Sequence, residues 1–262
     1  MLDRASGAVG QLSHLENYLK SLEERHLADL RFSDVTRALR ALSSAYVERR
    51  ETALAGRRAL DGAGKRAAFA LYYGPIHFLL VQHIVRQLGI DHPRRGTIVD
   101  LGCGTGVAGA AIATAAGEPA AVHLLGIDTH PWALDEARFT YKSFGLRAEV
   151  RRGHAARSRV PANTSFVIAA FVVNELRDDD RDRLLANLRG SQSPTLIVEP
   201  ISNRISPWWE DWTRALDARS DQWKARINPP PIVRRLATAA GLRPETLTAR
   251  SLFVRPASSR PS

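Results

Sequence analysis

With 262 residues, 44% of them hydrophobic, the chain is long enough for one substantial α/β domain with a smaller appendage, and its composition argues against wholesale disorder. The formal net charge is +10, from 37 lysine and arginine residues against 27 aspartate and glutamate residues, and such an excess favours contact with a polyanion. The single cysteine excludes an internal disulfide and any multi-cysteine metal or iron–sulfur site, so we expect no bound metal.

No segment predicts a membrane span or a secretion signal. The longest apolar run, residues 166–173, is far too short to cross a bilayer. The first ten residues, MLDRASGAVG, lack the apolar centre of a signal peptide. We therefore expect a cytoplasmic protein with no membrane partner.

Helices are predicted for the first third of the chain. Apolar residues recur at helical spacing in two stretches, at Leu12, Leu15, Leu19 and Leu22 and again at Val35, Leu39, Leu42 and Tyr46. A break is expected at residues 60–65, followed by a helix over residues 66–90 that is kinked near Gly74 and Pro75, because proline lacks a backbone N–H. We assign residues 1–92 to a helical extension that covers the acceptor site.

From residue 97 the pattern alternates between strands and helices. Strands are predicted at 97–102, 122–128, 148–153, 165–173 and 195–200, with a terminal strand near 246–254, and helices at 106–116, 131–145 and 178–190. Repeated β-α units predict an α/β fold with a doubly wound, mostly parallel, Rossmann-like sheet. We assign this domain to residues 93–256, and residues 257–262 to a short polar tail.

The densest glycine cluster follows the first of these strands and fits two ligand-binding patterns. Gly104, Gly106 and Gly109 fit the dinucleotide pattern G-x-G-x-x-G, whereas Gly102, Gly104 and Gly106 fit the G-x-G-x-G loop of S-adenosylmethionine enzymes. Ligands bind beyond the carboxyl ends of strands in such sheets, so the loop is in the right place for either cofactor. Asp128, which ends the second strand, could accept hydrogen bonds from the ribose hydroxyls of either cofactor.

Asp100, at the end of the first strand, separates the two interpretations. A carboxylate beside the loop would repel a pyrophosphate, and strongly so in a partly desolvated site. S-adenosylmethionine has no phosphate and carries an ammonium and a sulfonium, which a carboxylate attracts. The charge argument therefore selects S-adenosylmethionine over NAD.

The stretches VDLGCGTG (99–106) and LLGID (124–128) resemble motifs I and II of the class I methyltransferases, and the resemblance extends over roughly residues 97–200. It implies that Asp100, Gly102, Gly104 and Gly106 surround the methionine and ribose, with Asp128 at the ribose hydroxyls. The family often has an acid near the adenine after the third strand, where this chain has His154. Either His154 takes that role through a ring nitrogen, or the adenine is held by backbone alone.

Asn174 and Glu175 follow the fourth strand and are the candidate catalytic residues. At the end of that strand they would project near the methyl group, able to orient a nucleophile or accept its proton. The alternative is that Asn174 caps the following turn and Glu175 faces solvent.

Three further stretches, at residues 70–85, 169–188 and 196–200, resemble the methyltransferase-like family associated with the small ribosomal subunit, best known from mitochondria. This resemblance implies contact with rRNA or the small ribosomal subunit. Members of that family commonly carry cysteines consistent with a metal or iron–sulfur site, and because this chain lacks them, no metal role is carried over.

Four tryptophans gather in residues 206–223, at positions 208, 209, 212 and 223, in a stretch that predicts a helix with Ser206 as N-cap. They either pack a helix against the sheet or the N-terminal helices, form a lid over a small acceptor, or form a base-stacking platform.

A basic stretch surrounds the third strand, where Arg147, Arg151, Arg152, Arg157 and Arg159 could meet phosphates or form a solvated loop. The leading expectation is an S-adenosylmethionine-dependent methyltransferase that acts on RNA in a ribosomal context. The alternatives are a small-molecule O- or N-methyltransferase with a tryptophan-lined lid, and a cofactor-binding ribosome-assembly protein without catalysis.

Overall fold

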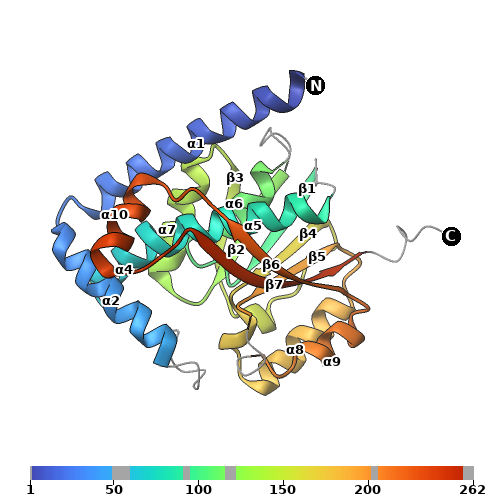
Figure 1. Ribbon diagram of the computed structural model, residues 1–262. Coiled ribbons are helices and arrows are strands. Elements are labelled where there is room, and N and C mark those ends of the chain that lie inside the picture. The colour runs from blue at the N-terminus through green and yellow to red at the C-terminus, as the bar shows by residue number, and fades with distance from the viewer. Residues whose placement is uncertain (1, 49–59, 91–94, 116–121, 202–205, 256–262) are drawn as a thin grey trace.

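The computed structural model describes residues 2–48, 60–90, 95–115, 122–201 and 206–255. Within them, a seven-stranded sheet runs in the order β3-β2-β1-β4-β5-β7-β6 (Figure 1). The first five strands of this order are parallel, and β7 is antiparallel to both of its neighbours. The strands are β1 (Gly96–Leu101), β2 (Val122–Asp128), β3 (Arg147–Arg152), β4 (Thr164–Ala170), β5 (Thr195–Glu199), β6 (Arg219–Arg226) and β7 (Thr246–Val254). The predicted doubly wound α/β sheet is confirmed.

Helices cover both faces of the sheet. Buried side chains of α5 (Gly74–Leu88), α6 (Val107–Thr114), α7 (Pro131–Ser143) and α10 (Pro231–Ala240) share one hydrophobic core. On the other face, α8 (Asp178–Arg189) and α9 (Trp209–Ala215) pack in a second core and lie side by side in Figure 1. The strand order reverses between β1 and β4, the position at which such sheets bind ligands.

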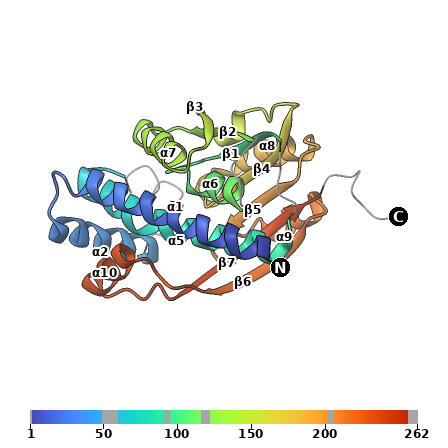
Figure 2. The same ribbon diagram turned by 90° about the horizontal axis from the view of Figure 1, so that it is seen from above.

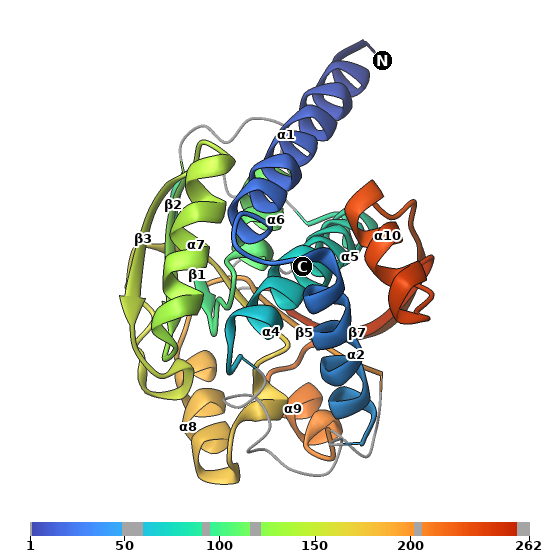
Figure 3. The same ribbon diagram turned by 90° about the vertical axis from the view of Figure 1, so that its left-hand side faces the viewer.

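The N-terminal helices belong to the first of these cores. They are α1 (Leu2–His26), α2 (Phe32–Glu48) and α4 (Ala63–Ala68), and Figure 3 shows α2 beside α10. Figure 2, seen from above, shows α1 running along this layer. The end of α1 is attached to α7, where the buried Glu136 receives Arg25 at 3.3 Å and His26 at 2.8 Å. The predicted extension therefore shares the core of the sheet, while its boundary at residue 92 and the tail 257–262 lie outside the described residues.

The predicted kink takes the form of a π-helical turn, Phe69–Tyr73, between α4 and α5. Pro75 has no N–H to donate to Leu71, so the regular helical register is lost one turn earlier. The whole stretch Ala63–Leu88 is long and apolar enough to cross a membrane, but 72% of its most apolar window is buried inside the fold. It is a core helix of an α/β domain.

Two predicted elements differ from the structure. β4 ends at Ala170, because Phe171 takes a left-handed conformation (φ 59°) and a 3₁₀ turn follows at Val173–Glu175. Residues 219–223, predicted as the end of a helix, belong to β6 (Arg219–Arg226) at the sheet edge, where the largely polar sequence buries only Ala225 and gives no alternating apolar signal.

Candidate active site

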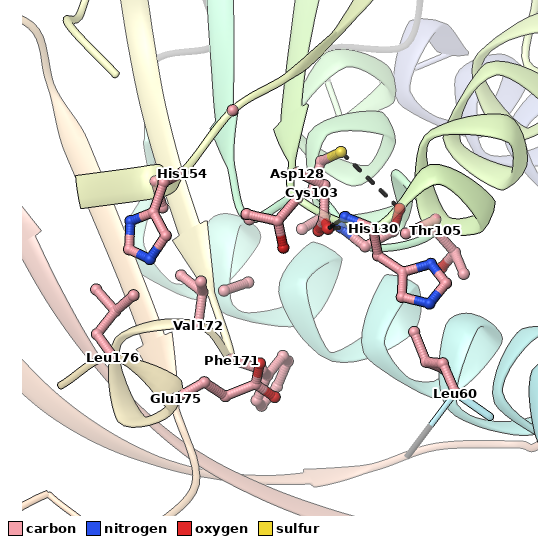
Figure 4. A pocket seen from close by; sticks show the side chains of 18 of the residues that line it. Leu60, Cys103, Thr105, Asp128, His130, His154, Phe171, Val172, Glu175 and Leu176 are labelled. Carbon is pink, nitrogen blue, oxygen red and sulfur yellow. Dashed lines mark hydrogen bonds between the residues drawn. The ribbon is translucent and has the colours of Figure 1, made fainter. Parts of the chain in front are cut away.

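A cavity of about 520 Å³ opens at the carboxyl ends of the parallel strands (Figure 4). This volume lies within the range of roughly 300–1,000 Å³ that is usual for small-molecule and cofactor sites. Four strand ends contribute to its wall: residues 102–105 after β1, 128–130 after β2, 153–155 after β3 and 170–172 after β4. Phe69, from the π-helical turn, and His77, from α5, also line it.

The glycine loop can follow its path only with glycine. A Cβ on Gly102, where φ is +67°, would lie 2.2 Å from Cγ2 of Val172. Gly104 is also left-handed (φ +51°), but a Cβ there would meet nothing within 4 Å. Since both residues line the cavity, Gly102 lets the loop approach β4, and Gly104 leaves space for a ligand. Gly106 (φ +78°) ends the loop as the N-cap of α6.

Asp128 lies in the cavity wall at the end of β2, as Figure 4 shows. Its carboxylate accepts the backbone N–H of Gly104 at 3.0 Å and that of His130 at 2.8 Å. The two bonds fix its orientation, and each oxygen retains a lone pair that can accept a hydrogen bond from a hydroxyl in the cavity.

Asp100 lies behind the loop and does not form part of the cavity wall. Its Oδ2 accepts the N–H of Gly109 at 2.8 Å and the hydroxyl of Tyr141 at 3.4 Å, while the buried Oδ1 has no partner among the described residues. Burial raises the pKa of Asp100 to about 7. The predicted direct contact with the methionine moiety is therefore corrected: Asp100 braces the loop against α6, and its charge is incomplete near neutral pH.

Asn174, the first candidate catalytic residue, is turned away from the cavity. Its Nδ2 donates to Oε2 of Glu199 at 2.7 Å, and its Oδ1 accepts from the Ser206 hydroxyl at 2.7 Å and the Trp208 indole at 3.2 Å. Both the amide nitrogen and the amide oxygen of the side chain are bonded in this network, so the structure replaces the predicted catalytic role with a structural one. The hydroxyl of Ser206 donates to Asn174 rather than capping α9, whose N-cap residue is Trp208.

Glu175, the second candidate, points into the cavity (Figure 4). Although the residue as a whole is exposed, desolvation by the surrounding protein together with the negative charge of Asp128 raises its pKa to about 7. A carboxylate with such a pKa is present in both protonation states near neutral pH, which suits a group that takes and releases a proton.

Comparisons with known proteins agree with this geometry. Residues 98–194 match the family model described as a methyltransferase domain. The chain contains an S-adenosylmethionine-dependent methyltransferase domain. No curated protein matches the chain.

Solved structures are similar to this methyltransferase, and the one with a TM-score of 0.52 supports the fold. The mitomycin 7-O-methyltransferase MmcR is 17% identical, over 91% of this chain and 72% of that chain, with a TM-score of 0.52. An S-adenosylmethionine-dependent methyltransferase from Aquifex aeolicus is 14% identical over 69% of this chain and 91% of that chain (TM-score 0.45). The tRNA (uracil-54, C5)-methyltransferase from Pyrococcus abyssi, in complex with S-adenosyl-L-homocysteine, is 16% identical over 66% of this chain and 38% of that chain (TM-score 0.44).

The residues of this methyltransferase fit its cofactor. Three acids and two arginines line the cavity: Asp128, Glu175, Asp180, Arg157 and Arg177. Asp180 is 3.5 Å from Arg157, and the other two acids, Asp128 and Glu175, oppose a pyrophosphate but suit a cationic ligand. The first turn of α6 adds Val107 and Ala108 to the wall, and a helix N-terminus is suited to a carboxylate such as that of the methionine moiety. The open space beside Gly104 gives the ligand access to the loop backbone. The charge argument for S-adenosylmethionine thus rests on these two acids rather than on Asp100.

His154 lies in the wall after β3, the position predicted for the adenine. Its Nε2 lies 3.6 Å from Oδ2 of Asp180, and its buried Nδ1 has no partner among the described residues. An uncommitted ring nitrogen is compatible with a contact to the adenine, which stays a prediction.

Sequence reasoning missed most of the aromatic residues of the cavity wall, among them Trp132, His77 and Phe171. Trp132 is the fifth tryptophan and lies in the first turn of α7, with the Arg66 guanidinium 5.9 Å from its ring. A signal was present for Trp132 and Phe171, because each follows the carboxyl end of a parallel strand. His77 could not be found in this way, since only tertiary packing brings α5 to the cavity.

The four predicted tryptophans lie elsewhere. Trp208, Trp209 and Trp212 are 8%, 4% and 2% exposed and pack with α8 against the sheet, on the face opposite the N-terminal helices. Trp223 lies in β6 and donates to Ser251 at 2.8 Å. The predicted lid and base-stacking platform are therefore wrong, and the packing alternative is confirmed.

Among the described residues, no group of three or more His, Cys, Asp or Glu side chains could hold a metal ion.

Proposed function

We propose that this methyltransferase acts on RNA, and the observation that carries the proposal is the basic edge of the sheet beside the cavity. β3 is the outermost strand, and Arg147, Arg151 and Arg152 are exposed along it. Arg152 lies opposite Asp128 in the β2–β3 register, at the end of the strand that meets the cavity. Guanidinium groups in this arrangement suit successive phosphates of a nucleic-acid strand.

Two further arginines extend this edge to the cavity itself. Arg157 and Arg177 line the cavity, and Arg157 is 3.5 Å from Asp180. An RNA strand that follows β3 would pass these side chains and present one nucleotide to the cavity, as enzymes that modify a base require. The net charge of +10 favours the same partner.

The residues of the cavity support catalysis rather than cofactor binding alone. Bound S-adenosylmethionine supplies a methyl group on a positively charged sulfur. The walls hold the acceptor in line with it, which lowers the barrier by orientation. The Glu175 carboxylate is placed to take the proton that the nucleophile loses, and this favours an enzyme over a ribosome-assembly protein without catalysis.

The ribosomal context, with rRNA or the small ribosomal subunit as partner, rests on the sequence resemblance of residues 70–85, 169–188 and 196–200. A cytoplasmic location follows from the same proposal. A small-molecule acceptor is the second candidate, favoured by the aromatic side chains of Phe69 and His77 in the cavity wall. In that case the tryptophan-lined lid plays no part.

Transfer of a labelled methyl group from S-adenosylmethionine into fractionated cell extract tests the proposal. We expect the label in RNA, concentrated in the small-subunit rRNA, and expect about 100-fold slower labelling with the Glu175→Gln variant. Label confined to small molecules would support the second candidate. Cofactor binding without any transfer to extract would support the assembly-protein alternative.

A further inference from the structure

Two aromatic rings from distant parts of the chain stack against each other in the cavity wall. His77, from α5, and Phe171, from the end of β4, have ring centroids 4.0 Å apart and an interplanar angle of 19°. Phe69 also lines the cavity, with its ring 6.4 Å from that of His77. This side of the cavity is therefore an aromatic surface, joined to Glu175, which lies next to Phe171 in Figure 4.

The backbone is irregular at both halves of this stacked pair. Phe171 is left-handed, with φ 59°, and its N–H is held by the carbonyl of Val198 at 2.8 Å. α5 begins directly after the π-helical turn Phe69–Tyr73, which sets the register that brings His77 over the cavity. Left-handed non-glycine residues and π-helical turns both cost stability and cluster at functional sites. Their coincidence at one ring pair points to a function for the pair.

His77 has hydrogen-bonding capacity that the fold does not use. Burial lowers the pKa of His77 to about 4, so the imidazole is neutral at physiological pH and offers one donor and one acceptor nitrogen. Within the described part of the chain, neither nitrogen has a hydrogen-bond partner. His77 is half-buried and neither of its nitrogens is enclosed by the protein, so a ligand in the cavity can bond to them.

The stacked pair occupies a different part of the wall from the predicted cofactor residues. Asp128 and His154 come from the ends of β2 and β3, whereas Phe171 follows β4 and His77 lies in α5. The two groups of residues can therefore serve two ligands at once.

We propose that His77 and Phe171 form the subsite for the acceptor ring: a planar heteroaromatic ring stacks on this pair, hydrogen-bonds to the imidazole and presents its nucleophile to Glu175. Under the proposed function this ring is a base of RNA. The inference rests on the proposed function in this one respect, because the subsite itself would accept a heteroaromatic ring from another molecule. Stacking on an aromatic side chain tolerates any base, so selectivity comes from the hydrogen bond to His77.

Four variants test the subsite. Phe171→Leu and His77→Leu remove a ring, His77→Phe keeps the ring but removes the hydrogen bond, and Phe139→Leu is the matched control, a half-buried ring of α7 outside the cavity wall. Each is measured for S-adenosylhomocysteine affinity by calorimetry, for thermal unfolding, and for kcat/KM on the acceptor that the wild-type protein labels in extract.

We expect the two leucine variants to lose about tenfold or more in kcat/KM, the scale of one lost base-stacking contact. S-adenosylhomocysteine affinity should change less than about twofold, and Phe139→Leu should keep the wild-type rate. His77→Phe should retain stacking but lose discrimination among acceptor rings. If a leucine variant fails to fold, this variant still tests whether His77 belongs to the acceptor subsite. Wild-type rates in folded Phe171→Leu and His77→Phe would overturn the subsite, and so would a parallel loss of cofactor affinity. Label in small molecules instead of RNA would overturn the proposed function alone, since the same variants still report on the subsite.

Discussion

Asn174 and Glu199 are joined by a 2.7 Å hydrogen bond that ties the loop after β4 to the end of β5. The carboxylate of Glu199, 0% exposed, also accepts the backbone N–H groups of Val173 at 2.7 Å and Asn174 at 3.3 Å. Burial raises its pKa to about 8, but every one of these partners is a donor, so the ionised form satisfies them all. This network fixes the loop that carries Phe171 and Glu175 into the cavity.

Removal of this carboxylate should destabilise the protein. Glu199→Ala leaves three donors without an acceptor in the core, and we expect the free energy of unfolding to fall by roughly 1–3 kcal/mol or more, the cost of unsatisfied buried groups. Chemical denaturation measures the effect. Glu149→Ala, at an exposed carboxylate of β3, is the control and should stay within about 0.5 kcal/mol of the wild type. Equal effects of the two variants would contradict a structural role for Glu199.

Two glycines of the loop should respond differently to alanine. In Gly102→Ala the new Cβ lies 2.2 Å from Val172, so we expect a loss of roughly 2–4 kcal/mol from overpacking and left-handed strain together. Gly104→Ala meets nothing within 4 Å and should lose only about 1–2 kcal/mol, from the strain alone. Its methyl group enters the cavity, however, and should weaken S-adenosylhomocysteine binding. Denaturation and calorimetry on both variants separate the two effects. A Gly104→Ala variant with unchanged cofactor affinity would place the ligand elsewhere.

The β-α core and its cofactor loop could be predicted because local patterns specify them. Buried parallel strands are continuous apolar runs, and the glycines follow the first strand directly. Asp128 was found for the same reason, since a residue at the end of a parallel strand faces the ligand edge of the sheet.

The errors arose where tertiary contacts decide. The sequence left packing, a lid and a stacking platform open for Trp208, and only the packing of α9 against the sheet shows that it belongs to the core. Asn174 and Glu175 are neighbours in sequence, yet one faces the network of Glu199 and the other the cavity, because a 3₁₀ turn separates their directions. His77 reaches the site across a long sequence separation, which no local pattern encodes.

The rate of methyl transfer should depend on the ionisation of Glu175. Since its pKa is raised from 4.5 to about 7, kcat/KM should increase with pH through about 7 and then level off, as the proton-accepting form becomes populated. Glu175→Gln should give a flat profile at a rate lower by about 100-fold. The pH dependence of stability has the opposite sign to that of the rate. The folded state holds this proton more tightly, so the contribution of Glu175 to the free energy of unfolding is lost as pH rises from 4.5 to about 7.

Measurements of kcat/KM against pH check the predicted rise of the rate. Denaturation at several pH values checks the predicted fall of the free energy of unfolding. Glu149→Gln should leave the rate profile of the wild type unchanged, because this exposed side chain of β3 lies outside the cavity wall. A Glu175→Gln enzyme that retains the wild-type pH profile would assign the proton transfer to another group.

The basic edge of β3 should set the salt dependence of RNA binding. Each phosphate contact on a single strand contributes about −0.7 to the slope of log affinity against log salt, so the double substitution Arg151→Ala with Arg152→Ala should make the slope shallower by about 1.4. Arg219→Ala with Arg226→Ala is the matched control. It removes two exposed arginines from β6, the opposite edge of the sheet, and each pair contains one arginine in an ion pair, Arg151 with Glu149 and Arg219 with Asp221. Binding is measured with small-subunit rRNA fragments over a range of salt, and S-adenosylhomocysteine affinity should be the same in both double variants. Equal changes of slope in the two would mean that RNA responds only to net charge, and a flat slope in the wild type would favour the small-molecule acceptor.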